Sequence, residues 1–391
     1  MLYPAIKFLS VALLAAALPP AGAQKLLTQI PLDSFSGDYA KADVAVNSAT
    51  NRIYVPLQFV DGSFYSPSYN YFRVLVVNGA TNQIVHNLAN FPSGSYYQAI
   101  AIDPVRNFTY VETGNTPYGY ELYDTPFRCA VSVVDGLGEE TVKTISLPAG
   151  DCGTMVVDSV TGKVYIRAAS EVDVIESEET GIVDTFSLPA YTGGFAGEPG
   201  TGLAVSPYAK RLYFTYNTGD FVEYLGFFDT SDNQISQEML IPAYIDDTNN
   251  GTNPVVNPMT GHIFGATDST SKGNLVSVFD SSGHLLATVV PPLTSTEYDA
   301  IVGLDVDPKT NLAFAFAETE NYKNGAEGTA LYVVDGASNT LRSSLAASLP
   351  PNSLNIIGGK VAVNPDTSRV YVPYNDPVVN SHFYLNIYSE Q

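Results

Sequence analysis

One pattern of hydrophobic and polar positions recurs along most of the chain. An apolar residue is followed by Asn, Asp or Ser, often by Pro, then by a polar turn and a segment of the form apolar–aromatic–apolar. This pattern predicts two short strands joined by a tight turn in each copy. We expect the aromatic side chain to pack in the core rather than to bind a ligand. The aromatic residues of the seven copies lie 48 to 57 residues apart and are Tyr54, Tyr110, Tyr165, Tyr213, Phe264, Phe314 and Tyr371.

A second pattern follows the first within the copies. An apolar strand leads into an Asn-Gly or Asp-Gly step and then into another strand, as at Asn78-Gly79, Asp135-Gly136 and Asp335-Gly336. Such steps predict hairpins, because glycine supplies the positive φ that tight turns need. Each copy therefore holds two hairpins, or four strands. A unit of this length with four strands is typical of one blade of a β-propeller.

The last copy lacks one strand. After Tyr371 only one further strand, residues 384–388, precedes the end of the chain. Residues 26–32 have the composition of a strand and belong to no other copy. Pairing them with the last copy would close the ring and remove an exposed sheet edge. The sequence therefore predicts an all-β, seven-bladed β-propeller with four antiparallel strands per blade, whose last blade is closed by the N-terminal strand.

The repeats resemble the YVTN family of β-propellers, which is found in exported and cell-surface proteins of bacteria and archaea. The resemblance covers nearly the whole chain after residue 23 and is specific for the fold. Tyr54-Val55-Pro56 and Tyr371-Val372-Pro373 depart from the Tyr-Val-Thr-Asn of the family, and the fourth and fifth copies diverge. The resemblance implies a binding or surface role.

The N-terminus predicts export. Lys7 precedes an uncharged apolar run, residues 8–18, and Ala21-Gly22-Ala23 places small residues where a signal peptidase cleaves. The run is too short to span a bilayer, which takes about 20 residues. We expect residues 1–23 to be a signal peptide and residues 24–391 to be one propeller domain. The mature chain, with no transmembrane segment, would act outside the cytoplasm, in the periplasm, at the cell surface or in the medium.

The charge of the chain narrows the possible partners. It has 40 acidic and 18 basic residues, a formal net charge of -22. A surface this acidic repels phosphate backbones, which argues against nucleic-acid binding. Cations, cationic proteins and neutral sugars remain compatible with it, and the charge also serves solubility.

The two cysteines, Cys129 and Cys152, are the whole cysteine content of the chain. An isolated pair in an oxidising compartment predicts a disulfide. Metal binding by two thiols is the weaker interpretation.

The predicted hairpins place the long connections at one face of the propeller. Loops on a rigid scaffold commonly carry the binding residues, and these loops are rich in tyrosine and acids. Aromatic rings beside carboxylates suit either a protein interface or a stacked sugar. The alternative is that they only keep long loops packed and soluble. The candidate ligand-binding residues are Tyr96, Tyr118, Tyr120, Tyr244, Tyr298 and Tyr322.

Catalytic motifs are missing from the sequence. It has no HExxH or paired-histidine metal motif, no glycine-rich phosphate loop followed by a helix and no Gly-x-Ser-x-Gly elbow. No catalytic residue is assigned and no organic cofactor is predicted. The leading hypothesis is a binding scaffold for a protein or glycan. The alternative is a metal-dependent hydrolase of the lactonase type, in which acids near the central channel bind Ca²⁺. The candidate metal ligands are Asp246, Asp247, Glu297 and Asp299.

Overall fold

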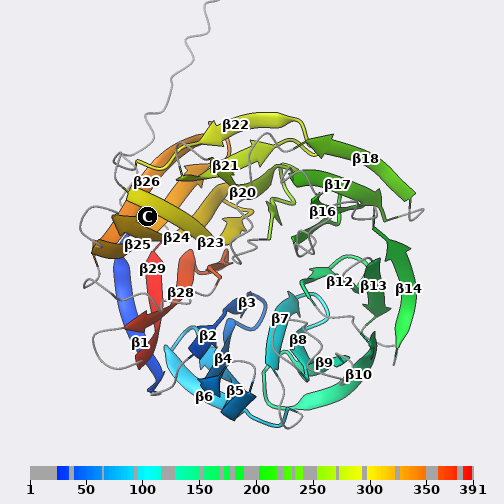
Figure 1. The fold of residues 1–391 in the computed structure, drawn as a ribbon, viewed down its shortest axis with the longest axis vertical. Coiled ribbons are helices and arrows are strands. Elements are labelled where there is room, and N and C mark those ends of the chain that lie inside the picture. The colour runs from blue at the N-terminus through cyan, green and yellow to red at the C-terminus, as the bar shows by residue number, and fades with distance from the viewer. Residues whose placement is uncertain are drawn as a thin grey trace, which may run out of the picture.

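The strands of this chain form a closed ring of sheets. The computed structural model describes residues 24–34, 39–63, 66–91, 96–115, 128–149, 153–167, 171–176, 181–188, 202–217, 223–230, 234–240, 253–269, 273–292, 297–321, 326–348, 360–376 and 382–389. Within them, every regular element is a β-strand, and seven sheets stand like blades around one axis (Figure 1). The predicted seven-bladed β-propeller is confirmed. The described residues contain no helix that could cross a membrane.

In each blade the first strand lies nearest the axis and the last lies at the rim (Figure 1). The first blade contains β2 (Tyr39–Ala42), β3 (Ala45–Asn47), β4 (Arg52–Ser63), β5 (Ser66–Asn78) and β6 (Gln83–Leu88). The second contains β7 (Tyr96–Asp103), β8 (Phe108–Gly114), β9 (Arg128–Asp135) and β10 (Thr141–Ala149). The third contains β11 (Met155–Asp158), β12 (Lys163–Arg167), β13 (Glu171–Glu176) and β14 (Ile182–Ser187).

The remaining blades follow the same order. The fourth contains β15 (Leu203–Ser206), β16 (Arg211–Asn217), β17 (Glu223–Asp229) and β18 (Gln234–Leu240). The fifth contains β19 (Val255–Val256), β20 (Ile263–Ser269), β21 (Gly273–Phe279) and β22 (Leu285–Val289). The sixth contains β23 (Glu297–Asp307), β24 (Leu312–Asn321), β25 (Ala326–Asp335) and β26 (Thr340–Ser348). The seventh contains β27 (Ala362–Asn364), β28 (Arg369–Asp376), β29 (His382–Ser389) and, from the N-terminus, β1 (Leu26–Ser34).

The ring closes as predicted. β1 pairs antiparallel with β29, with Gln29 opposite Asn386 and Ile30 opposite Leu385. β29 begins at His382, two residues before the predicted start of this strand. Residues from the opposite end of the chain thus complete the last blade, and β29 has a paired strand on each side.

Proline interrupts the innermost strand of the first blade. β2 and β3 both pair with β4, and the two are separated at Asp43 and Val44. Opposite this gap lies Pro56, whose carbonyl accepts a hydrogen bond from the Asp43 N–H at 3.1 Å. Pro56 has no N–H to return, so the ladder cannot run through it. In the seventh blade, pairing of β27 with β28 likewise starts at Tyr371 and does not reach Pro373.

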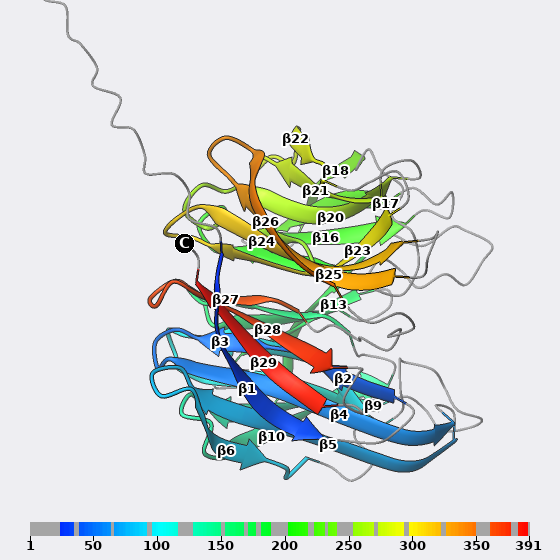
Figure 2. The ribbon, with the colours of Figure 1, turned by 90° about the vertical axis from the view of Figure 1, so that its left-hand side faces the viewer.

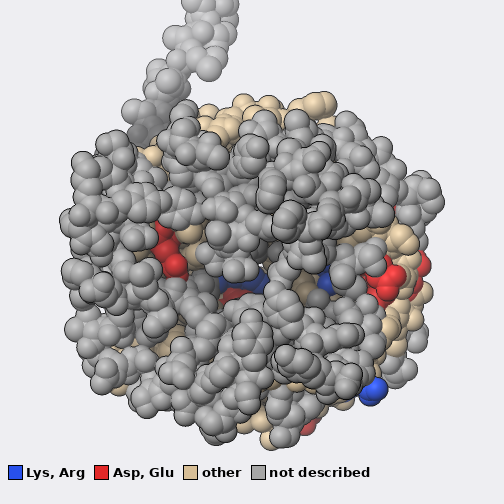
Figure 3. Space-filling view, in the orientation of Figure 1, with Lys and Arg blue, Asp and Glu red and all other residues tan. Residues whose placement is uncertain are grey.

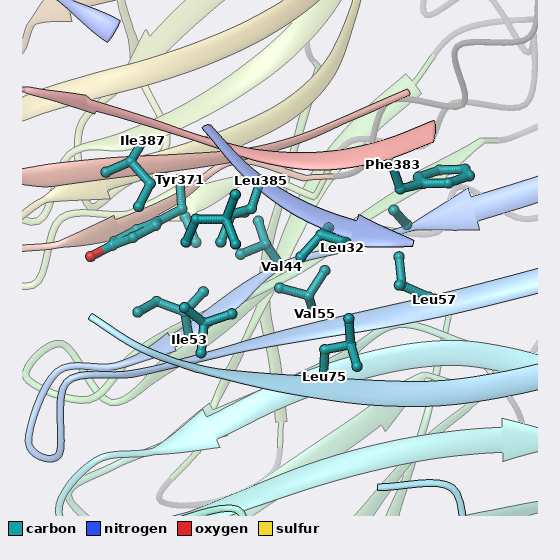
Figure 4. Close-up of a cluster of buried hydrophobic side chains, with 14 of the residues drawn as sticks. Leu32, Val44, Ile53, Val55, Leu57, Leu75, Tyr371, Phe383, Leu385 and Ile387 are labelled. Atoms are coloured by element: carbon teal, nitrogen blue, oxygen red, sulfur yellow. The ribbon is translucent and has the colours of Figure 1, made fainter. Parts of the chain in front are cut away.

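The hydrophobic core is divided among the seven spaces between neighbouring blades. Each space holds one cluster of buried side chains, and each repeat aromatic packs against the next blade. All seven aromatics are at most 1% exposed, which confirms their predicted core role. Figure 4 shows the cluster at the closure, where Tyr371 and Leu385 of the last blade face Ile53 and Val55 of the first. The hydroxyl of Tyr54 also donates to the carbonyl of Asp135 in the next blade, at 3.2 Å.

Short turns join the first two strands of every blade at one face. Each begins with a capping Asn, Asp or Ser, and the residue four places later has a positive φ in all seven blades. These residues are Asn51, Asn107, Gly162, Lys210, Gly261, Asn311 and Ser368. Several caps also bond to the next blade: the Asn47 amide donates to Asn107 Oδ1 and that of Asn364 to Asn51 Oδ1, both at 2.9 Å.

The glycines of the Asn-Gly and Asp-Gly steps have a different role from the predicted one. Gly79, Gly136 and Gly336 do not have positive φ; in the hairpins of the first and last of them, Asn82 and Asn339 do. A Cβ on any of the three glycines would overlap an asparagine side chain from the inner turn of the same blade. Glycine is needed here for close packing between two turns, so the reason given by the sequence was wrong although the hairpins form.

Candidate functional site

The two faces of the ring differ in the length of their connections. At one face every connection between successive strands is short, the longest spanning residues 257–262. The opposite face receives the four longest connections, residues 115–127, 188–202, 241–254 and 349–361. We call these the short-turn face and the long-loop face. The side view shows the ends of β4 and β5 reaching farther toward the long-loop face than most other strands (Figure 2).

The predicted ligand-binding tyrosines fall in three groups. Tyr96 lies in β7 rather than in a junction loop, and its side chain is only 7% exposed. Burial raises the pKa of its phenol. Tyr298 lies in β23 opposite Glu320, also within a strand, and the structure describes its backbone only. The other four lie outside the described residues: Tyr118, Tyr120, Tyr244 and Tyr322.

The predicted metal ligands are only partly placed. Glu297 and Asp299 belong to the start of β23, opposite Asn321 and Thr319. The structure describes only the backbone of these two residues. Asp246 and Asp247 lie outside the described residues. No group of three or more His, Cys, Asp or Glu side chains in the described part of the chain could hold a metal ion, and calcium binding remains a prediction.

The first cysteine of the predicted disulfide is in place. Cys129 is the second residue of β9 and is 4% exposed. Only Arg128 separates it from the connection 115–127, so a bridge from it would fix one end of that segment. Cys152 lies outside the described residues, and the disulfide remains a prediction.

Polar groups of the seventh, first and second blades are bonded to one another across the blade boundaries. This arrangement was not anticipated from the sequence. The Tyr97 hydroxyl donates a short hydrogen bond to Asp43 Oδ2, and the Lys360 ammonium lies 3.2 Å from the same oxygen. The Tyr97 N–H donates to Gln58 Oε1 at 3.0 Å. Burial, and secondarily the negative charge of Asp43, raise the pKa of Tyr97 well above its usual range. These contacts join three blades around one carboxylate.

Similar polar contacts cross the next two blade boundaries. Glu112 and Arg167 each lie two residues after a repeat aromatic and are at most 4% exposed. Glu112 accepts from the Gly153 N–H in the third blade at 3.3 Å, and Arg167 donates to the carbonyls of Gly202 and Thr215 in the fourth. In both cases a charged group bonds to the backbone of the following blade, so it links neighbouring blades.

Asp305 is a third polar feature of the inner strands. Its carboxylate accepts from the N–H groups of Val306 at 2.8 Å and of Val363, in the next blade, at 2.7 Å. Burial raises the pKa of Asp305 to about 7, against the lowering effect of these two hydrogen bonds. The six other blades all have alanine or valine at this repeat position, as at Ala101 and Val156. That departure is the sequence signal that could have singled it out.

The contacts of these polar groups hold neighbouring blades together. The described groups bond mainly across blade boundaries, and we find among them no nucleophile bonded to a base. Looking down the axis, charged atoms of both signs appear at the centre of the face (Figure 3).

Comparison with known proteins supports the fold and goes no further. No protein-family model matches the sequence, and no curated protein matches it. One chain in the crystal structure of a mitotic checkpoint complex is similar over 100% of this chain and 98% of its own, with a TM-score of 0.59 and 12% identity. The β-propeller domain of Myceliophteria thermophila Cps50 (Swd1) is similar over 93% and 99%, with a TM-score of 0.57 and 10% identity. The protein is thus a seven-bladed β-propeller in its fold, and its likeness to the YVTN family remains a resemblance.

Proposed function

We propose that this protein is an exported scaffold that binds another protein through its long-loop face. The observation that supports this most directly is the segregation of the connections. The four longest connections start and end at one face, while the opposite face carries only short turns. A closed ring whose blades are bonded to one another holds the ends of those connections in fixed positions. Fixed positions lower the entropic cost of binding.

A protein is the better-supported partner. The fold is that of WD40-type propellers, and one of the similar chains is part of a protein complex. No comparison favours a glycan. The net charge of -22 favours a partner with a basic surface, because complementary charge speeds association and suppresses wrong pairings.

Export rests on the sequence of residues 1–23 and on the cysteine pair. The apolar run with one preceding lysine and a small-residue cleavage site has the form of a signal peptide. A disulfide between Cys129 and Cys152 would be stable only in an oxidising compartment. Both features therefore point to the same location.

A tyrosine-to-alanine variant of the long loops tests the binding role. The mature protein is used to capture partners from the cell-surface and secreted fraction of its host, and a captured protein is then purified. We expect Tyr118→Ala/Tyr120→Ala/Tyr298→Ala to weaken its binding by at least tenfold, as loss of interface aromatics commonly does. The control is Val142→Ser/Val183→Ser, two exposed residues of the rim strands β10 and β14.

The affinities are measured by calorimetry after both variants are shown to melt at the wild-type temperature. Wild-type affinity in the folded tyrosine variant would reject the long-loop face as the binding surface. Equal loss in the rim control would show that the effect is not local to that face.

A further inference from the structure

One position in the inner turns of the short-turn face is exposed in every blade. It is the residue two places after the capping Asn, Asp or Ser, and the seven residues are Ala49, Val105, Val160, Tyr208, Met259, Lys309 and Asp366. In four consecutive blades, the second to the fifth, this residue is a large apolar side chain. Their exposures are 71% for Val105, 59% for Val160, 72% for Tyr208 and 71% for Met259. We call these four residues the apolar arc.

Successive residues of the arc belong to adjacent blades, and the turns of the second and third blades are bonded to each other. Arg106, next to Val105, donates to the backbone carbonyls of Ser159 at 3.1 Å and Val160 at 3.3 Å in the following blade. Single exposed apolar residues are normal on proteins. Four at the same turn position in successive blades expose on the order of 500 Å², the size at which an apolar patch is often functional.

The turns hold these side chains in fixed positions. The cap Asp103 accepts from the N–H groups of both Val105 and Arg106 at 3.0 Å. The cap Asn257 accepts from the Met259 N–H at 2.8 Å. Because the backbone is already ordered, little conformational entropy is lost when a partner covers the arc.

The charge around the arc is opposite to that of the protein. The seven inner turns hold seven basic residues and four acids, and three of these acids, Asp103, Asp158 and Asp307, are buried caps at most 2% exposed. The fourth, Asp366, is ion-paired to Lys309 at 2.5 Å. Around the rim of the same face the outer turns are acidic. The basic excess is therefore confined to a narrow inner zone of a chain whose net charge is -22.

We infer that the apolar arc is a docking surface for a partner protein that presents a short segment combining aliphatic or aromatic side chains with Asp or Glu. Apolar residues of the segment would cover the arc, and its acids would meet Lys163 and Lys210 beside it. A second copy of this chain fits poorly, because a two-fold contact would set one basic inner zone against another. This surface is on the opposite face from the long loops and does not depend on them.

Selection from a displayed library of random peptides provides the test. The mature protein is the bait, and enriched peptides are synthesised and titrated by fluorescence polarisation. We expect the enriched sequences to combine apolar residues with Asp or Glu. Tyr208→Ser/Met259→Ser should weaken binding at least tenfold, and Lys163→Gln/Lys210→Gln severalfold with a loss of salt dependence. The rim control Val142→Ser/Val183→Ser should leave binding within twofold.

Three results would overturn the inference. The first is that no enriched peptide combines apolar residues with Asp or Glu, whatever basic peptides the acidic long-loop face also enriches. The second is binding of the enriched peptides to Tyr208→Ser/Met259→Ser with wild-type affinity. The third is a dimer of the wild-type protein in sedimentation that the same variant converts to monomer, which would assign the arc to a second copy. Because none of these results involves the long loops, each is distinguishable from failure of the long-loop proposal.

Discussion

Replacing Gly336 by alanine should destabilise the protein, and removing one asparagine should reverse the sign of the effect. The φ of Gly336 is not positive, so alanine is compatible with its backbone. An added Cβ would, however, lie 2.7 Å from Oδ1 and 2.9 Å from both Cγ and Nδ2 of Asn311. That amide cannot turn away freely, because its oxygen accepts a hydrogen bond from Asn257 of the preceding blade.

The magnitude follows from these contacts. Crowding of a packed site costs about 1–3 kcal/mol, so Gly336→Ala should lower the free energy of unfolding by about 2 kcal/mol. In an Asn311→Gly background all three crowding atoms are gone. Gly336→Ala should then stabilise the protein by about 0.4–1 kcal/mol, because it restricts the unfolded chain. The expected coupling between the two positions is about 2–3 kcal/mol.

Urea unfolding of the wild type, both single variants and the double variant measures this coupling. Midpoints are compared only where the slopes agree, since equal slopes indicate the same transition. Gly181→Ala is the matched control, because a Cβ there would meet nothing within 4 Å. If Gly336→Ala costs the same in both backgrounds, or no more than Gly181→Ala, the packing explanation of this glycine is wrong.

Three further predictions concern ionisable and cysteine residues. The folded-state pKa of Asp305 is about 7, above its ordinary 3.8, so the native state holds a proton that the unfolded state releases, and stability falls as pH rises from about 4 to 7. Asp305→Asn should remove roughly 4 kcal/mol of this fall, measured by urea midpoints across the range; an unchanged pH profile contradicts the assignment. Lys360→Ala leaves the buried Asp43 carboxylate without its cation and should cost about 3–5 kcal/mol in thermal unfolding, more than Asp43→Ala, which leaves behind an ammonium that can reach water; equal costs would count against this. A reductant should lower the melting temperature of the wild type to that of Cys129→Ser and leave that of the variant unchanged. The expected loss in the free energy of unfolding is about 3 kcal/mol. A wild type whose melting temperature is insensitive to reductant has no such disulfide.

The repeat made the architecture predictable. The apolar–aromatic–apolar strand and its preceding turn are local patterns, and each repeat aromatic, such as Tyr110 or Phe314, is buried against the next blade as the pattern indicated. Closure could also be anticipated, because a strand missing at one end of the chain matched a spare strand at the other. Both inferences need only the count of strands and their periodicity.

Contacts between blades could not be predicted in the same way. Asp43, Tyr97 and Lys360 come from three blades, and their meeting depends on the register of strands far apart in sequence. The gap opposite Pro56 depends on which residues face each other across β4. For the candidate site, the length of the long connections could be predicted from the sequence. Tyr96, however, lies in a strand and its side chain is buried in the core. A tyrosine beside a loop and one at the start of a strand look alike in sequence.

The inner turns show where a repeat protein can carry information beyond its fold. The capping residue bonds the turn backbone, and the residue four places later takes the positive φ. The side chain two places after the cap, between them, is exposed in all seven blades, so the turn places no demand on it. Packing cannot explain why Val105 and Tyr208 are apolar there, and solubility favours polar residues at such a position. The docking surface that we propose would account for these apolar residues.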